Sequence, residues 1–138
     1  MTEIDENSAH EIQVHKELLE LSSRLLNSID QQDWTTYCEL CDESLTAFEP
    51  EAVGNLVAGM SFHEFYFRQE GNNIRKQSTI SSPHVRLLGD VAVVTYVRLV
   101  QKESSTESAE TLAFEETRVW QKNNGRWQHV HFHRSPGA

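Results

Sequence analysis

The sequence contains no apolar run long enough to cross a bilayer, and it is poor in basic residues. Only 12 lysines and arginines stand against 21 aspartates and glutamates, so the 138-residue chain has a formal net charge of -9. Nucleic-acid binding needs a concentrated basic surface, and this balance argues against such a partner. The first residues also lack the basic-then-apolar pattern of a secretory signal. We therefore expect a cytoplasmic protein with neither a membrane nor a nucleic-acid partner.

Cysteine is scarce, with only Cys38 and Cys41, in a C-x-x-C spacing. A zinc or redox site would need a second ligand pair or a thioredoxin-like turn. Both residues lie in a helical pattern, where thiols usually serve as small buried hydrophobes. We therefore predict that the pair packs in the core and that the chain holds no metal and no cofactor.

Histidines alternate near the end of the chain, at His129, His131 and His133. On one face of a strand, alternate side chains stand roughly 7 Å apart, so only adjacent pairs could share a metal ion. We predict that this face serves packing or contact between subunits.

A hydrophobic fraction of 38% in a chain of this length predicts one folded domain. Apolar residues recur every three or four over 10–29, which predicts a long amphipathic helix. Asp33 is a plausible N-cap for a short second helix that ends near Cys41. Ser61 and Glu64 form a capping box that begins a third helix. The aromatic residues of this third helix that we expect in the core are Phe62, Phe65 and Tyr66.

Beyond the third helix the hydrophobic period changes to two, which predicts strands. The turn signals Gly89-Asp90 and Asn123-Asn124-Gly125 separate some of them. Helices followed by an antiparallel meander indicate an α+β fold, in which a strongly curved antiparallel sheet wraps around the long N-terminal helix. The predicted strands are 45–49, 76–83, 84–88, 91–102, 111–122 and 126–134.

Three predicted strands each carry one arginine among apolar or aromatic neighbours on a single face: Arg98, Arg118 and Arg134. If these faces line the concave side of the sheet, the three guanidinium groups converge in one cavity. Buried cations need anions nearby. Two interpretations remain open. Either the arginines serve structure alone, compensated by internal carboxylates such as Glu116, Glu49 or Glu51 or reaching solvent past an apolar rim, or the cavity binds the carboxylate of a ligand or peptide.

Short segments spread over most of the chain carry a resemblance to a known family. The longest are 46–52 (TAFEPEA), 54–57 (GNLV), 115–120 (EETRVW) and 130–135 (VHFHRS), with shorter ones at 62–63 (FH), 65–67 (FYF) and 88–90 (LGD). In order and spacing they resemble the association (hub) domain of calcium/calmodulin-dependent protein kinase II.

This resemblance implies a cone-shaped, nuclear transport factor 2-like fold of the cystatin-like α+β kind. It implies homodimers that stack as rings, dodecameric or tetradecameric, and that cluster attached or partner kinase domains. Arg98, Arg118, Arg134 and His63 match positions lining the family's cavity, which is associated with small carboxylates and with docking of a kinase regulatory segment. Glu116 and Glu49 are then pocket acids or internal counter-ions.

The sequence also predicts boundaries and an interface. Residues 1–8 are expected to form a flexible acidic extension, 9–135 the association domain, and 136–138 a tail. The residues predicted to anchor contacts between subunits are Trp120, Trp127 and Phe132. Gly71 stands where some animal hubs carry a tryptophan, which puts a ligand gate at that position in doubt.

Kinase chemistry is not expected in this chain, because it has no glycine-rich nucleotide loop, no H-R-D and no D-F-G motif. No basic amphipathic segment suggests a calmodulin target. An alternative is an enzyme of the ketosteroid isomerase-like or dehydratase-like type that uses the same cavity, with Glu116 or His63 as acid or base. Three nearby arginines would make such a carboxylate a weak base, so we predict a non-catalytic domain.

Overall fold

The structure is a computed structural model of the chain, and it describes residues 3–69, 74–104 and 108–136. Gly71 and most of the polar segment between the fourth and fifth strands lie outside these residues. Within the described part, no helix combines the length and the hydropathy needed to span a bilayer.

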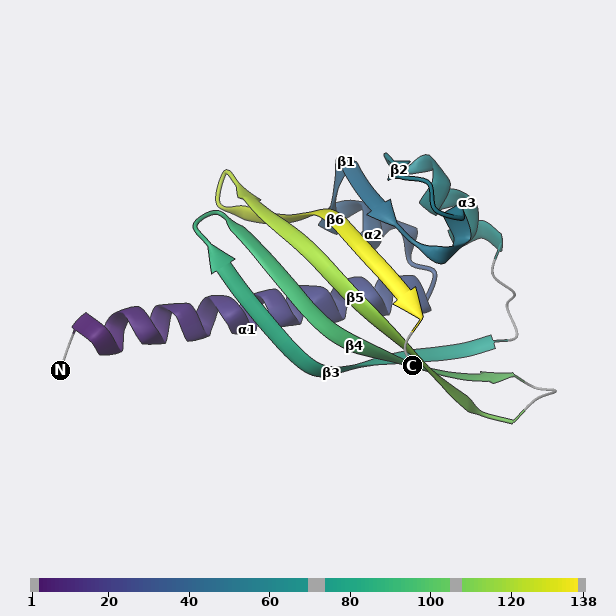
Figure 1. Cartoon of the computed structure of the whole chain (residues 1–138), viewed down its shortest axis with the longest axis horizontal. Coiled ribbons are helices and arrows are strands. Elements are labelled where there is room, and N and C mark those ends of the chain that lie inside the picture. The colour runs from purple at the N-terminus through teal and green to yellow at the C-terminus, as the bar shows by residue number, and fades with distance from the viewer. Residues whose placement is uncertain (1–2, 70–73, 105–107, 137–138) are drawn as a thin grey trace.

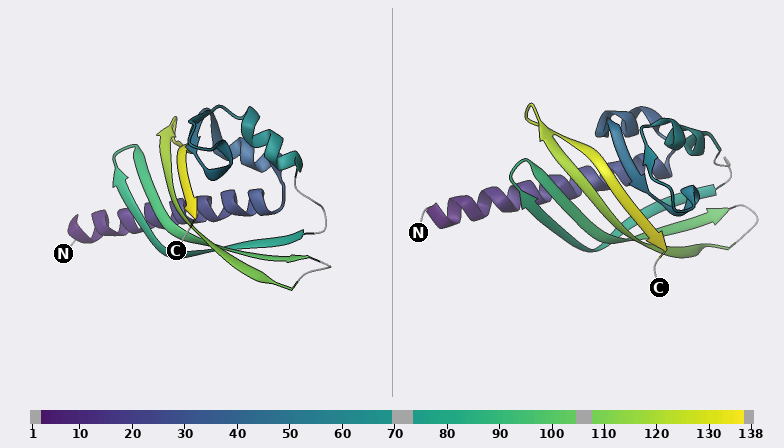
Figure 2. Two further views of the ribbon diagram at one scale, coloured as in Figure 1. Left: turned by 45° about the vertical axis from the view of Figure 1, so that its right-hand side comes forward. Right: turned by 45° about the horizontal axis from the view of Figure 1, so that its top comes forward.

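The long helix α1 (Glu3–Asp30) lies across the strongly curved sheet, and its N-terminal turns project beyond the sheet (Figures 1 and 2). Its buried side chains Leu18, Leu25 and Leu26 follow the helical period and enter the core. The helix begins seven residues before the start that periodicity predicts, so it includes part of the segment expected to be a flexible extension. The side chains of residues 6–13 are exposed, which explains why no apolar pattern marks this first part.

The second helix, α2 (Trp34–Leu40), begins and ends as predicted. Asp33 caps it, since the Thr36 N–H donates to Asp33 Oδ1 at 3.2 Å. The chain then enters strand β1 (Cys41–Phe48) without a loop. As a result Cys41 is buried at the start of the strand while Cys38 is exposed on the helix, and the prediction that both thiols pack in the core is wrong for Cys38.

A short segment between β1 and the third helix contains the 3-10 turn η1 (Pro50–Ala52) and strand β2 (Val57–Ala58). The third helix, α3 (Ser61–Gln69), begins at the predicted serine. Its inward face carries His63 rather than the expected Phe65, which is 57% exposed. Phe67, four residues after His63, joins the same face because side chains four apart stack on one side of a helix.

Four long strands complete the sheet: β3 (Ile74–Leu88), β4 (Val91–Ser104), β5 (Glu110–Asn123) and β6 (Arg126–Pro136). The order is β2-β1-β6-β5-β4-β3, and all neighbours are antiparallel except β1 and β6, which are parallel. Helices followed by this curved meander confirm the predicted α+β fold. The parallel pair is the one departure from a fully antiparallel sheet.

The two strands predicted at 76–83 and 84–88 are one strand, β3, with an irregularity between Ser81 and His84. Ser82 there adopts a left-handed backbone conformation, with φ of 51°. Pro83 does not end the strand because β3 lies at the edge of the sheet, where a missing N–H breaks no ladder bond.

The three residues predicted as interface anchors lie in the core of the chain itself. Trp120, Trp127 and Phe132 are 0%, 5% and 4% exposed, respectively. Trp120 shares the concave face with Arg118, because residues two apart on a strand point to the same side. The prediction that these residues anchor contacts between subunits is therefore wrong for this structure.

Candidate functional site

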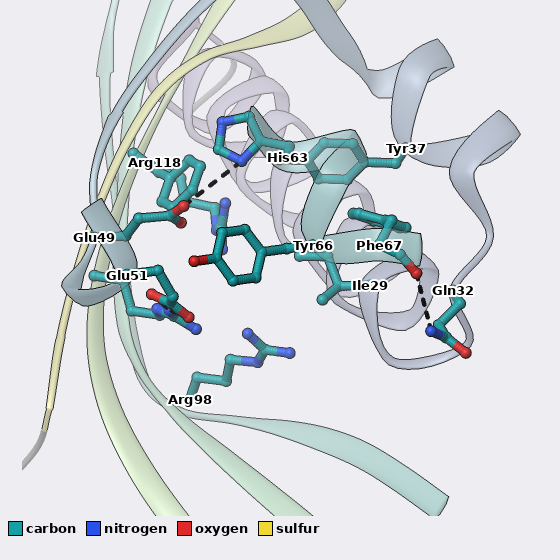
Figure 3. Close-up of a pocket in the computed structure, with 12 residues that line it drawn as sticks. Ile29, Gln32, Tyr37, Glu49, Glu51, His63, Tyr66, Phe67, Arg98 and Arg118 are labelled. Atoms are coloured by element: carbon teal, nitrogen blue, oxygen red, sulfur yellow. Dashed lines mark hydrogen bonds and ion pairs between the residues drawn. The ribbon is translucent and has the colours of Figure 1, made fainter. Parts of the chain in front are cut away.

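A cavity of about 110 Å³ lies between the concave face of the sheet, helix α3 and the end of α1 (Figure 3). All three arginines singled out by strand alternation line it, and so does His63. Glu49 and Glu51 enter it from the segment that follows β1. Aromatic rings form much of the remaining wall, from Tyr37, Tyr66, Phe67 and Phe132. The sequence therefore predicted correctly which cations share one cavity.

Arg98 is fully engaged by protein groups. Its Nη2 donates to Asp30 Oδ1 at 2.8 Å, and its Nε donates to Ser78 Oγ at 2.8 Å. Its Nη1 donates to Glu116 Oε2 at 3.4 Å. Asp30, at the end of α1, is a partner that sequence reasoning missed, because nothing in a polar helix end shows which strand it will face.

Arg118 is held even more tightly. Its Nε donates to the Tyr96 hydroxyl at 2.8 Å, its Nη2 donates to Glu116 Oε1 at 3.0 Å, and its guanidinium lies 4.5 Å from the centre of the Phe132 ring. Burial works against the cation, but the Glu116 carboxylate raises the pKa of Arg118 above its usual range.

Glu116 is the shared counter-ion of Arg98 and Arg118. Tyr96 also donates its hydroxyl to Glu116 Oε1, at 2.7 Å. Burial alone would raise the pKa of Glu116, but the two guanidinium charges and the tyrosine hydrogen bond hold it below its ordinary value. A carboxylate bound in this way is a weak base.

Arg134 is paired differently, through Nη2 alone, with both carboxylate oxygens of Glu51. The ring of Phe114 lies 5.2 Å from its guanidinium carbon. Burial opposes ionisation of Glu51, but the hydrogen bond and charge of Arg134 lower the pKa of that carboxyl. Within the described residues, Arg134 Nε is buried and has no hydrogen-bond partner.

Glu49 and His63 lie close together on another side of the cavity. Glu49 Oε1 lies 3.8 Å from His63 Nδ1, which is long for a hydrogen bond (Figure 3). Burial, together with the charge of Glu51, raises the pKa of Glu49 to about 7. Burial and the charge of Arg118 lower the pKa of His63 to about 4. At neutral pH the histidine is therefore neutral and the glutamate is close to half protonated.

The two interpretations of the arginine cluster can now be compared. Three cations, from Arg98, Arg118 and Arg134, are paired with the side chains of three acidic residues, Asp30, Glu116 and Glu51. Internal pairing is therefore present in the structure, and Glu49 is a fourth carboxylate without an arginine partner among the described contacts.

A family model for the calcium/calmodulin dependent protein kinase II association domain matches residues 14–138. The chain belongs to this family. It is 47% identical over 126 residues to the calcium/calmodulin-dependent protein kinase type II alpha chain of Drosophila melanogaster, covering 89% of this chain and 24% of the relative. It also matches the solved association domain of C. elegans CaMKII with a TM-score of 0.80 and 41% identity, covering 95% of this chain and 98% of that one.

The nuclear transport factor 2-like fold of this association domain is shared more widely. A nuclear transport factor 2-like superfamily protein from Salmonella enterica matches with a TM-score of 0.77 at 24% identity, over 93% of this chain and 94% of that one. The association domain spans about a quarter of the length of the curated kinase relatives, 23% and 24% of two of them.

One buried group of this association domain escaped the sequence reasoning. His129 was predicted to share the outer face of the last strand with His131 and His133, but it is fully buried. A register shift in the β5–β6 pairing, between Val119 and Trp120, breaks the simple alternation. Such a bulge depends on how two strands pair, so it leaves no pattern in either strand.

The buried His129 ring lies between Cys41 and Arg118. Its Nε2 is 3.3 Å from Arg118 Nη1 and its Nδ1 is 3.4 Å from Cys41 Sγ. Because a guanidinium nitrogen can only donate, Nε2 accepts and Nδ1 carries the proton towards sulfur. Burial and the nearby Arg118 charge lower the pKa of His129 well below its usual range, which keeps it in this neutral form.

His131 and His133 stay on the outer side, as predicted. The Thr46 hydroxyl lies 2.7 Å from His131 Nδ1, and the Phe48 ring lies against both imidazoles. Among the described residues no group of three or more histidine, cysteine or acidic side chains could hold a metal ion.

Proposed function

We propose that this association domain assembles with copies of itself into dimers and closed dodecameric or tetradecameric rings, and so clusters attached or partner kinase domains. Family membership supports this proposal, as does the likeness to structures titled as CaMKII hub and association domains. The observation that carries it in this chain is the outer face of its sheet.

The outer face is mostly apolar and only partly covered, although β5 also places Thr117 and the exposed Glu115 on it. Along β4 the residues that point away from α1 are Val91, Val93, Thr95, Val97 and Leu99, and each is only half-buried. On β5 Val119 and Ala113 continue the same surface. A two-fold contact would bury the face of one copy against the same face of another.

Val97→Arg tests this role of the sheet face. A charge placed in a buried contact costs far more than it does in solvent, so the variant should dissociate into smaller species. The control is Thr35→Lys, which adds a charge at an exposed position of α2. Native mass spectrometry should give a multimer for the wild type and the control. A single-chain mass for the wild type at micromolar concentration would refute self-association.

We further propose that the cavity lined by Arg98, Arg118, Arg134 and His63 binds a small carboxylate, or docks a carboxylate side chain of a kinase regulatory segment. Two buried nitrogens of the cavity, His63 Nε2 and Arg134 Nε, have no partner within the described residues, and a ligand would satisfy them. A carboxylate of about six non-hydrogen atoms should bind with a dissociation constant in the micromolar to millimolar range. Titration with butyrate tests the proposal, and the next subsection gives its design.

The geometry does not favour the enzymatic alternative. Glu116 is committed to Arg98, Arg118 and Tyr96, and its lowered pKa makes it a weak base. His63, with a pKa near 4, is a poor proton acceptor at neutral pH.

A further inference from the structure

The three cavity arginines differ in how far they remain available to a ligand. The side chains of Arg98 and Arg118 are 5% and 1% exposed, while that of Arg134 is 16% exposed. All three guanidinium nitrogens of Arg98 and of Arg118 already have protein partners. Arg134 uses Nη2 for Glu51 and leaves Nε without a partner in the described part of the chain.

A carboxylate normally binds arginine through two parallel hydrogen bonds, and Nε with Nη2 forms one of the two edges that allow this. Glu51 contacts only one nitrogen of that edge. Its carboxylate nevertheless occupies the position that a bound carboxylate would take on Nη2. Two carboxylates on this single edge would repel each other, and Glu49 lies in the same cavity.

The segment that carries Glu51 is weakly held. Glu51 lies in η1, a single 3-10 turn with no buried residue. Its backbone bonds are local, from the Ala52 N–H to Glu49 O and from the Val53 N–H to Pro50 O, each at 3.1 Å. Val53 after it is 83% exposed. Ala52 packs against the core, and the side-chain contact from Glu51 to Arg134 is a second link between this turn and the rest of the domain.

We propose that Glu51 is an internal competitor for the anion site on Arg134, so that a carboxylate ligand binds by displacing the Glu51 side chain from this guanidinium. The inference rests on the proposed carboxylate binding. Under this proposal, Glu51 sets the affinity of the cavity for a carboxylate. Arg98 and Arg118 line the cavity, but their charges are already paired with carboxylates of the protein.

Glu51→Gln tests the competition, because it keeps the size of the side chain and removes its charge. Ligand-observed NMR titration with butyrate at neutral pH should show binding about five- to ten-fold tighter than in the wild type, since a neutral amide competes less well for a guanidinium. Glu64→Gln is the control, because it neutralises a half-buried glutamate that pairs with Arg68 outside the cavity. Butyramide, which lacks the charge, should gain nothing from either substitution.

Arg134→Gln, alone and combined with Glu51→Gln, locates the effect. Both proteins should lose most of the butyrate affinity, and the double variant should show no gain over the single one. Hydrogen exchange gives a second readout. Butyrate should speed exchange of the Ala52 and Val53 amides in the wild type, and it should have no such effect in Glu51→Gln.

The outcomes separate the two proposals. If the wild type binds butyrate and Glu51→Gln binds it equally or more weakly, the competition is overturned while carboxylate binding stands. If only the variant binds, the competition is supported in its strongest form. If neither protein binds butyrate at tens of millimolar, carboxylate binding falls and the competition falls with it.

Discussion

Glu116→Gln should destabilise the domain strongly, because Glu116 is the anion that two buried arginines share. After the substitution Arg98 keeps its pair with Asp30 and its bond to Ser78. Besides the neutral amide that replaces the carboxylate, Arg118 keeps the Tyr96 hydroxyl, the His129 ring nitrogen and the Phe132 face, none of which carries a negative charge. One cation with 1% side-chain exposure is thus left without a carboxylate.

Removing one partner of a buried ion pair costs about 3–5 kcal/mol, against about 5–15 kcal/mol for the whole stability of a domain. We expect a loss near the top of the first range, since Glu116 serves two cations. The assay is urea unfolding followed by tryptophan fluorescence, at one fixed protomer concentration because association adds to apparent stability. The control is Glu11→Gln, which neutralises an exposed glutamate of α1 away from both the cavity and the outer sheet face.

The same variant has a pH signature. The pKa of Glu116 is lower in the folded than in the unfolded chain, so its contribution to stability is present above the unfolded value and is lost as pH falls through the folded value. Glu116→Gln should therefore lose the most stability at neutral pH and approach the wild type in acid. A loss below about 1 kcal/mol, equal to that of the control, would refute the shared counter-ion, since breaking a buried pair should cost several times more.

Two further predictions concern the cavity and the thiols. The pKa of Glu49 is raised to about 7 in the folded chain, so its contribution to stability is present in acid and is lost as pH rises through that value. Glu49→Gln should therefore become more stable relative to the wild type between pH 4.5 and 7, measured by paired unfolding curves. A difference in unfolding free energy that stays constant over this range would contradict the prediction. In the native protein, iodoacetamide should label the exposed Cys38 and spare Cys41, because burial raises the pKa of the Cys41 thiol to about 12. Cys38→Ser should then show no labelling by mass spectrometry until the chain unfolds. Labelling of Cys41 in the native state would contradict the structure.

Strand alternation located the cavity arginines because Arg98 and Arg118 both lie on regularly paired stretches of the meander. The helix starts at Trp34 and Ser61 were also predicted correctly, and at Trp34 the cap formed by Asp33 is a local interaction. Local sequence patterns were therefore sufficient to predict these features, and short local segments were also sufficient to recognise the family resemblance.

Other features depend on distant pairing and could not be predicted. Asp30 reaches Arg98 across 68 positions of sequence, and the bulge that turns His129 inward arises only when β5 and β6 meet. Trp120 was expected on the surface although its alternation partner Arg118 was expected inside. In that case the sequence pattern was sufficient, and the expectation of an aromatic interface overrode it.

The two margins of the sheet bear on what kind of assembly this chain can form. One border is the two-residue strand β2, and the other is β3, whose hydrogen-bonding row is interrupted near Ser82 and by the missing amide of Pro83. The first border is too short, and the second is divided at Ser82 and Pro83, so neither offers an unbroken row of backbone groups along a whole long strand onto which another chain could add. Growth into an open fibre is thereby discouraged, and copies that meet face to face can form a particle of finite size.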